Sequence, residues 1–165
     1  TTFLNSLLAE LTGLCPDERL AILEDTPELQ CEAPDRLRLR TAPGLGLYDL
    51  LDGVLRASPH RIVVGEVRDG SALAMLDAWN TGHPGGLATL HANTCHDALL
   101  RLGTLIQRAN VPPQPQLIAA TVSLIVRLAG TTAGRRSVVE LAEVRGYSAT
   151  QHRFDLETLF ARSPR

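Results

Sequence analysis

Short apolar segments of strand length alternate with amphipathic helical segments along most of the chain. In residues 2–12 apolar side chains recur every three or four positions, and the apolar run of residues 20–25 follows. Residues 61–65 and 87–93 repeat the strand pattern, and a helical pattern follows each of them. A strand that is apolar throughout must be covered on both faces. The alternation therefore predicts an α/β fold, with a mostly parallel sheet flanked by helices.

The remaining segments extend this alternation. Further helices are expected over residues 47–58, between Ser71 and Gly82, after Thr94, and briefly after the helix-breaking "VPPQPQ". Further strands are expected over residues 37–41 and in "LIVRLA", "SVVELAEV" and "RFDLETLF". The turn "GTTAGRR" separates the first two of these late strands. Thr94 and Asp97 have the spacing of a capping box, which predicts the start of a helix between them.

Composition excludes several classes of protein. The 165 residues carry 16 basic and 18 acidic side chains, a formal net charge of −2. This balance gives no strong positive field, and we expect no direct sequence-specific binding of nucleic acid. No apolar run reaches the roughly 18 residues of a membrane span. The three cysteines are odd in number and widely spaced, which fits neither a disulfide framework nor a zinc site and favours a reducing cytoplasm.

Polar side chains follow three of the predicted strands at the point where each strand ends. They are Glu24 and Asp25, then Glu66 and Arg68, and finally Thr89, His91 and Asn93. Ligands of open parallel sheets bind at the carboxyl ends of the strands, so neighbouring strands would bring these groups to one edge. A carboxylate in such a crevice can orient a water for attack on phosphorus or hold Mg²⁺ through water.

These residues also have plainer interpretations. Glu66 can be the first residue past the core, facing water, and Glu24 with Asp25 can be an acidic pair in a turn. Arg68 can pair with Glu66 or Asp69, or it can compensate the charge of a phosphate group.

The glycine-rich loop and the alternating arginines are open to two interpretations each. His83 can be an ordinary loop histidine, while the glycines around it allow close approach to a ligand or a change of shape. His91 and His96 are five residues apart, which does not match the helical pairing of a zinc site. Arg36, Arg38 and Arg40 are expected to form a solvated strand edge, or alternatively a subunit contact that lends an arginine to a neighbour's nucleotide.

Three stretches together resemble the nucleotide-binding boxes of the secretion-superfamily ATPases. "LAILEDTPEL" resembles their acidic box, and "RIVVGEVRD" resembles their atypical Walker B, in which glycine replaces the usual first acid. "NTGHPGGLATLHAN" resembles their His box, and all three boxes occur in the family's order and spacing. The longer wording "AWNTGHPGGLATLHAN" and the later "ELAEVRGY" are most similar to the conjugal-transfer ATPases of this superfamily. The resemblance covers residues 1–147.

The resemblance implies a RecA-like P-loop NTPase core that binds ATP and Mg²⁺ and forms a homo-hexameric ring. The ring would lie on the cytoplasmic side of the bacterial inner membrane, with peripheral membrane contact only. Its ATP hydrolysis would power pilus assembly or DNA or protein transfer, with inner-membrane components of the channel as partners. The alternative is a non-catalytic ring-forming or docking module of the same fold. A small-molecule hydrolase is disfavoured because no nucleophile motif such as G-x-S-x-G occurs.

The resemblance also assigns roles to single residues. Glu66 would polarise the attacking water, and Glu24 and Asp25 would lie near Mg²⁺ and water, with Arg68 in the same catalytic group. The phosphate-sensing box would be formed by His91, with Thr89 and His83 nearby.

A Walker A loop, G-x-x-x-x-G-K-[ST], does not occur in the sequence. The resemblance places Thr1 directly after its lysine, as a hydroxyl ligand that would share Mg²⁺ with Glu24 and Glu66, and Thr2 follows. We therefore expect residues 1–165 to be a carboxyl-terminal ATPase domain that lacks its upstream strand, its Walker A loop and an amino-terminal domain. The chain alone should bind ATP poorly and hydrolyse it barely, because each lost charge-assisted contact is worth about 1.5–3 kcal/mol.

Overall fold

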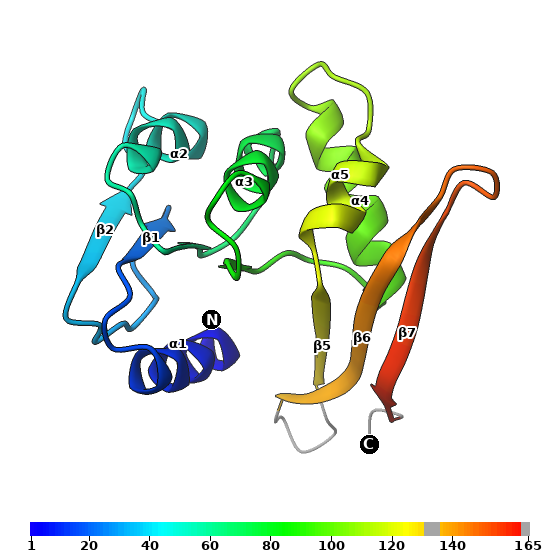
Figure 1. Ribbon diagram of the computed structural model, residues 1–165, viewed down its shortest axis with the longest axis horizontal. Coiled ribbons are helices and arrows are strands. Elements are labelled where there is room, and N and C mark those ends of the chain that lie inside the picture. The colour runs from blue at the N-terminus through cyan, green and yellow to red at the C-terminus, as the bar shows by residue number, and fades with distance from the viewer. Residues whose placement is uncertain (131–135, 163–165) are drawn as a thin grey trace. The chain divides into compact units, whose positions relative to one another are not determined.

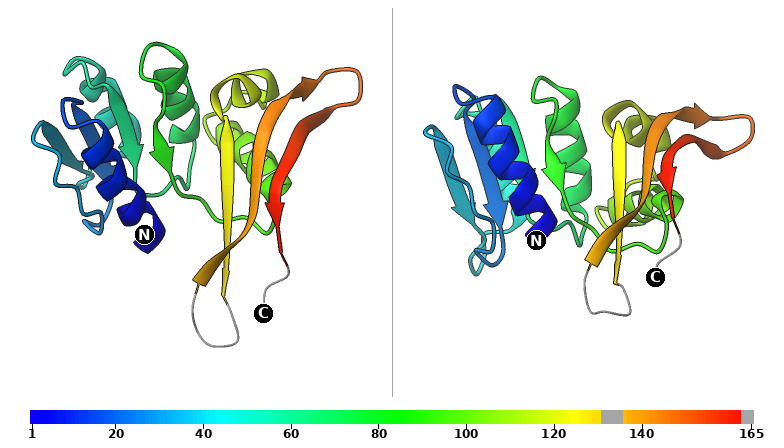
Figure 2. Two further views of the ribbon diagram at one scale, coloured as in Figure 1. Left: turned by 60° about the horizontal axis from the view of Figure 1, so that its bottom comes forward. Right: turned by 90° about the horizontal axis from the view of Figure 1, so that it is seen from below.

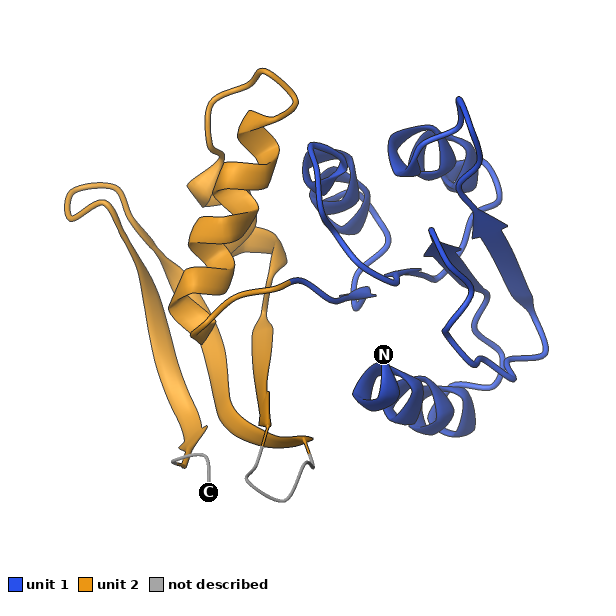
Figure 3. Cartoon of the chain, turned by 180° about the vertical axis from the view of Figure 1, so that it is seen from behind, with its two compact units in different colours: residues 1–90 blue, residues 91–165 orange. Residues whose placement is uncertain are grey.

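The computed structural model describes residues 1–130 and 136–162. The chain forms two compact units, residues 1–90 and residues 91–165 (Figure 3). Most of the expected turn "GTTAGRR" lies outside the described residues.

A four-stranded parallel sheet with helices on both faces makes up the first unit (Figure 1). Its elements are α1 (Thr2–Leu14), β1 (Leu20–Glu24), β2 (Arg36–Arg40), α2 (Leu47–Leu55), β3 (Arg61–Val64), α3 (Ser71–Asn80) and β4 (Leu87–Ala88). The strand order is β2-β1-β3-β4, and every neighbouring pair is parallel. Helix α1 covers one face, and α2 and α3 lie on the other (Figures 1 and 2). The predicted α/β architecture is confirmed.

Strand β1 is buried at all of its positions, so its side chains must be covered on both faces. Leu20 and Ile22 form a buried cluster with Leu4 and Leu8, which lie one turn apart on α1. Val63 of β3 joins the same cluster. This packing fixes the start of α1 near the carboxyl ends of β1 and β3, where the candidate site lies.

The two edges of this sheet differ. Strand β2 alternates exposed arginines with half-buried leucines, as the sequence predicts for an edge strand. Strand β4 makes only two pairs with β3, Val63 with Leu87 and Val64 with Ala88. The predicted strand over residues 87–93 is therefore wrong beyond Ala88. The physical reason is that Thr89 directs its hydroxyl and its carbonyl to the backbone after β3.

An antiparallel three-stranded sheet and two helices make up the second unit. Its elements are α4 (Cys95–Gln107), α5 (Pro115–Thr121), β5 (Leu124–Gly130), β6 (Arg136–Ser148) and β7 (Arg153–Ala161). Thr94 caps α4, because its hydroxyl accepts a 2.9 Å hydrogen bond from the Asp97 amide, as the predicted capping box requires. The late strands do not extend the parallel sheet. Strands β6 and β7 are joined too tightly for a parallel crossover and form a hairpin instead (Figure 2).

The longest helices, α1 and α4, have 13 residues each. Across residues 1–130 and 136–162, no helix has the length and apolar character that crossing a bilayer requires.

Candidate nucleotide-binding site

A polar cleft opens at the carboxyl ends of β1 and β3 in the first unit. Side chains from four separate stretches line it: Thr1; Glu24, Asp25 and Glu28; Glu66 and Arg68; and Thr89. The sequence predicts that three polar strand endings meet at one edge of the sheet. This is confirmed for Glu24 with Asp25, for Glu66 with Arg68, and for Thr89. His91 and Asn93 of the third ending belong to the second unit, so their part of the prediction stays a prediction. The cleft is rich in carboxylates and includes one guanidinium, which is a suitable set for a charged ligand with a cation.

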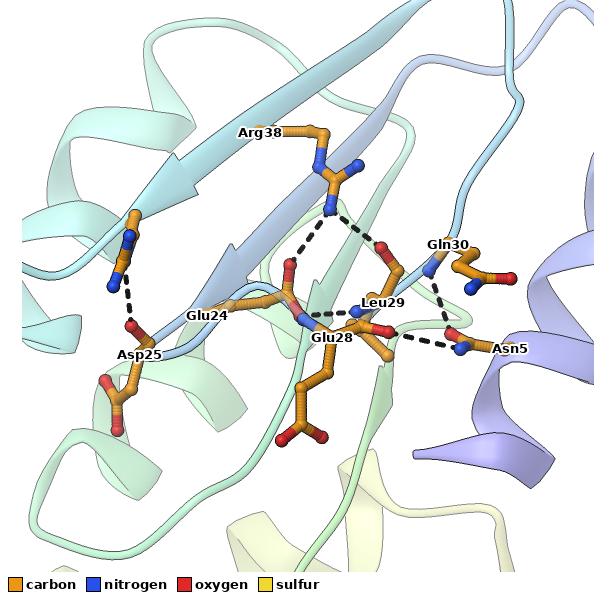
Figure 4. A network of polar contacts seen from close by, with 8 residues as sticks. Asn5, Glu24, Asp25, Glu28, Leu29, Gln30 and Arg38 are labelled. Atoms are coloured by element: carbon orange, nitrogen blue, oxygen red, sulfur yellow. Dashed lines mark hydrogen bonds and ion pairs between the residues drawn. The ribbon is translucent and has the colours of Figure 1, made fainter.

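Glu24 is the most enclosed charged group of the cleft, with a relative exposure of 6%. Its Oε1 accepts hydrogen bonds from the backbone amides of Glu28 (2.8 Å) and Leu29 (2.7 Å) (Figure 4). Its Oε2 pairs with Arg38 of β2 at 3.3 Å. The same guanidinium donates to the Leu29 carbonyl at 2.7 Å. Glu24 thus folds the loop after β1 back onto the strand that precedes it.

Helix α1 holds the same loop from its other side. The Asn5 side chain donates to the Glu28 carbonyl (3.2 Å) and accepts from the Gln30 amide (2.9 Å) (Figure 4). The Glu28 carboxylate in turn accepts a hydrogen bond from the Thr1 hydroxyl. Glu28 was not among the predicted site residues. The available signal was a third carboxylate in the same stretch, four residues after Glu24.

Glu66 and Arg68 form an ion pair at the mouth of the cleft, with 2.5 Å between Oε2 and Nη2. Asp25 lies 4.0 Å from the same guanidinium. The hydrogen bond to Glu66 raises the pKa of Arg68 above its usual value, so this side chain is cationic throughout the physiological range. The plainer interpretation of Arg68, a partner for Glu66, is therefore confirmed for the unliganded chain.

Gly65 follows β3 directly and precedes Glu66 of the cleft. A Cβ added to Gly65 would come within 3.3 Å of Glu24 Cγ and 3.6 Å of the Leu23 carbonyl. A larger side chain there would displace the buried Glu24 and the loop it holds. The glycine therefore makes room for the acid of the neighbouring strand.

Thr89 makes two contacts with the chain around Glu66. Its hydroxyl donates to the Gly65 carbonyl at 2.5 Å, and its own carbonyl accepts from the Val67 amide at 2.9 Å. One of these bonds is made at Gly65, before Glu66 in the chain, and the other at Val67, after it.

His83 is not brought into the cleft. Its Nδ1 lies 2.6 Å from the carbonyl of Pro59, which precedes β3, so the ring is at the amino end of that strand. Beside it, the Trp79 indole donates to the Ile62 carbonyl at 3.0 Å. A Cβ added to Gly86 would lie 2.1 Å from that indole nitrogen. This glycine is required by packing against Trp79, and not by approach to a ligand at the cleft.

The other predicted residues have these positions. Thr2 is exposed and begins α1 directly after Thr1. His91 begins the second unit, so its phosphate-sensing role stays a prediction. The arginines of β2 bond to this chain's own backbone: Arg36 to the Ala33 carbonyl, Arg38 to the Leu29 carbonyl and Arg40 to the Asp25 carbonyl.

The donor atoms of the cleft suit a magnesium ion that keeps much of its water. Within the described residues, no group of three or more His, Cys, Asp or Glu side chains is arranged to hold a metal directly. Mg²⁺ needs few direct protein ligands, because it retains waters and binds phosphates of the substrate. Thr1 donates its hydroxyl proton to Glu28, which leaves the oxygen lone pairs available for a cation.

The fold of the chain is the RecA-like fold that is also found in solved secretion-system ATPases. The chain belongs to the family described as "Type II/IV secretion system protein", which matches residues 1–154.

The relatives include conjugal transfer proteins. The chain is 43% identical over 159 residues to the probable conjugal transfer protein TrbB of Sinorhizobium fredii, covering 96% of this chain and 49% of the relative. It is 46% identical over 147 residues to the conjugal transfer protein TrbB of Rhizobium radiobacter, covering 89% of this chain and 45% of the relative. The chain thus spans about half the length of these relatives.

Among solved structures, the chain resembles the VirB11 ATPase of the Brucella suis type IV secretion system, crystallised in complex with sulphate. The TM-score is 0.74 at 26% identity, over 84% of this chain and 44% of that one. This agreement supports the RecA-like fold predicted from the sequence.

Proposed function

We propose that the chain is the ATP-hydrolysing domain of a motor that serves a conjugative type IV secretion system. The observation that carries the proposal is the cleft at the carboxyl ends of β1 and β3, which places Thr1, Asp25 and Glu66 together. The likeness to the VirB11 ATPase supports the activity, and the conjugal-transfer relatives support a conjugative system.

Each cleft residue has a role in the proposal. Glu66 orients the attacking water and draws on its proton, while Arg68 holds the carboxylate in place and supplies positive charge for the phosphates. Asp25 and Glu28 would lie near the Mg²⁺ and its waters, and Glu24 fixes the loop that carries them. Mg²⁺ would be held by the Thr1 hydroxyl, with Glu24 and Glu66 acting through water, and it would neutralise charge that develops on the phosphates.

In the proposal Thr1 is the final residue of a Walker A motif, and Thr2 follows it at the start of α1. In a P-loop the backbone amides and the lysine hold the phosphates, so residues 1–165 alone should have little ATPase activity.

Assembly and location follow from the family resemblance. The motor would form a homo-hexamer on the cytoplasmic side of the bacterial inner membrane, where it would contact membrane components of the secretion channel peripherally. The resemblance also makes His91 a sensor of the terminal phosphate in this proposal.

A direct test measures ATP turnover of the full-length protein with a Walker A loop upstream of Thr1. Glu66→Gln should lower kcat by at least about 100-fold, because it removes the general base but keeps the size of the side chain. Asp52→Asn, on an exposed carboxylate of α2 that lies outside the cleft lining, serves as the control and should leave turnover unchanged. Unchanged turnover in Glu66→Gln would refute the catalytic assignment.

The second candidate is a ring-forming or docking module that does not hydrolyse nucleotide. Sizing the full-length protein with and without Mg-ATP separates the two candidates. Assembly that depends on nucleotide supports the motor, whereas assembly that is the same in both conditions, together with no turnover, supports the module.

A further inference from the structure

We propose that Thr89 is a positioning residue for Glu66, and not a ligand of the nucleotide phosphates. The inference rests on the proposed function, because Glu66 is the acid that the proposal assigns to the attacking water.

Two hydrogen bonds from Thr89 flank Glu66 in the chain. One runs from the Thr89 hydroxyl to the Gly65 carbonyl, and the other from the Val67 amide to the Thr89 carbonyl. The peptide groups before and after Glu66 are thus both tied to a single residue of the neighbouring segment. The backbone at a position sets the direction in which its Cα–Cβ bond leaves the chain, so these bonds direct the Glu66 side chain toward the cleft, where Arg68 pairs with its carboxylate.

The Thr89 hydroxyl proton already takes part in a hydrogen bond within the chain. A threonine hydroxyl has one proton to donate, and this one goes to the Gly65 carbonyl. Phosphate oxygens are acceptors, so the hydroxyl can bond to a phosphate only after it gives up that carbonyl. Gly65 is also held from its other side, because its amide donates to the Leu23 carbonyl at 2.9 Å.

The pairing of β3 with β4 is too short to fix the backbone at Glu66. Strands β3 and β4 share only the pairs Val63–Leu87 and Val64–Ala88. At the amino end of this ladder, the Trp79 indole binds the Ile62 carbonyl; at the carboxyl end, Thr89 binds the Gly65 carbonyl. Beyond the ladder, the Thr89 hydroxyl and one backbone bond, from the Val67 amide to the Thr89 carbonyl, hold the chain on either side of Glu66.

The test compares variants of the full-length protein with its Walker A loop. Thr89→Val keeps the shape but removes the hydroxyl, and Thr89→Ser keeps the hydroxyl. We expect Thr89→Val to lower kcat by about 10-fold, as expected for one lost hydrogen bond, with the KM for ATP unchanged. Thr89→Ser should restore most of the turnover. A raised KM with unchanged kcat in Thr89→Val, or no change in either, would overturn the proposal.

A second measurement does not depend on turnover. Amide hydrogen exchange at Val67 should be about 10-fold faster in Thr89→Val than in the parent, since the segment that accepts this hydrogen bond is no longer pinned. Thr81→Val is the matched control, because the Thr81 hydroxyl donates to the Asp77 carbonyl on α3 and not near Glu66. Equal exchange in the parent and Thr89→Val overturns the proposal. If Thr89→Val does not fold, Thr89→Ala serves the same comparison.

The Glu66→Gln variant distinguishes a failure of the Thr89 positioning role from a failure of the proposed function. If Glu66→Gln abolishes turnover while Thr89→Val affects neither kcat nor exchange, the positioning role fails and the proposed function stands. If Glu66→Gln leaves turnover intact, the catalytic assignment fails, and the exchange at Val67 alone then decides whether Thr89 fixes this backbone.

Discussion

Replacing Glu24 by alanine tests the claim that this carboxylate organises the acidic loop. The change removes the acceptor of the Glu28 and Leu29 backbone amides, and the Leu29 amide is buried. A buried amide without a partner costs about 1–3 kcal/mol. The amide of the exposed Glu28 can turn to water, and the half-exposed Arg38 loses a pair worth less than about 1 kcal/mol. We therefore expect the free energy of unfolding to fall by about 1–4 kcal/mol.

Trp79 makes the measurement specific to the first unit. It is the single tryptophan of the chain, and it is partly buried against β3. Its fluorescence in a urea titration therefore follows the unfolding of the unit that contains Glu24.

Two further variants show which part of Glu24 matters. Glu24→Gln retains an oxygen for the two amides and should cost only about 1 kcal/mol, through the lost charge opposite Arg38. Asp25→Ala removes an adjacent but exposed carboxylate and should cost less. If Glu24→Ala destabilises the first unit no more than Asp25→Ala does, then Glu24 does not anchor the loop.

Three more outcomes follow from the structure. Gly86→Ala should destabilise the first unit by about 1–3 kcal/mol in the urea titration, because the new Cβ would lie 2.1 Å from the Trp79 indole nitrogen. The hydrogen bond from Arg61 holds the pKa of Glu18 below 4.5, so this pair stabilises the fold above that value and is lost as the pH falls through the lowered pKa. Thermal melts should therefore show a smaller loss of Tm between about pH 5 and pH 3 for Glu18→Gln than for the parent. Burial raises the pKa of the Cys95 thiol to about 12, so iodoacetamide at about pH 8 should label Cys95 only after unfolding, as mass spectrometry can show.

The controls for these outcomes lie in the same chain. Gly13 has no neighbour within 4 Å of an added Cβ, so Gly13→Ala should leave stability unchanged or raise it by about 0.5–1 kcal/mol. Glu10→Gln removes an exposed carboxylate of α1 and should melt with the same acid sensitivity as the parent. Cys15, which is only half-buried, should react with iodoacetamide before unfolding. A Cys95 that reacts as fast as Cys15 would contradict the burial argument.

The sequence by itself determined the elements of the first unit and the edge at which their polar endings meet. Periodicity reports which side chains seek the core, and four apolar residues in a row, as in Ile22 and its neighbours, require a strand covered on both faces. Because parallel strands end at one edge, Glu24 and Glu66 had to approach each other once their strands became neighbours. The three boxes then indicated the family, which the comparisons confirm.

Only the tertiary structure decided how these groups are used. Whether Glu24 faces water or accepts two amides depends on a loop that returns from Leu29, and local periodicity carries no information about such partners. The same holds for His83, which bonds to Pro59 at the far end of the strand, and for the short β4 that Thr89 ends. The hydrogen bonds of a polar side chain depend on backbone groups that are distant in sequence, so packing had to bring them together first.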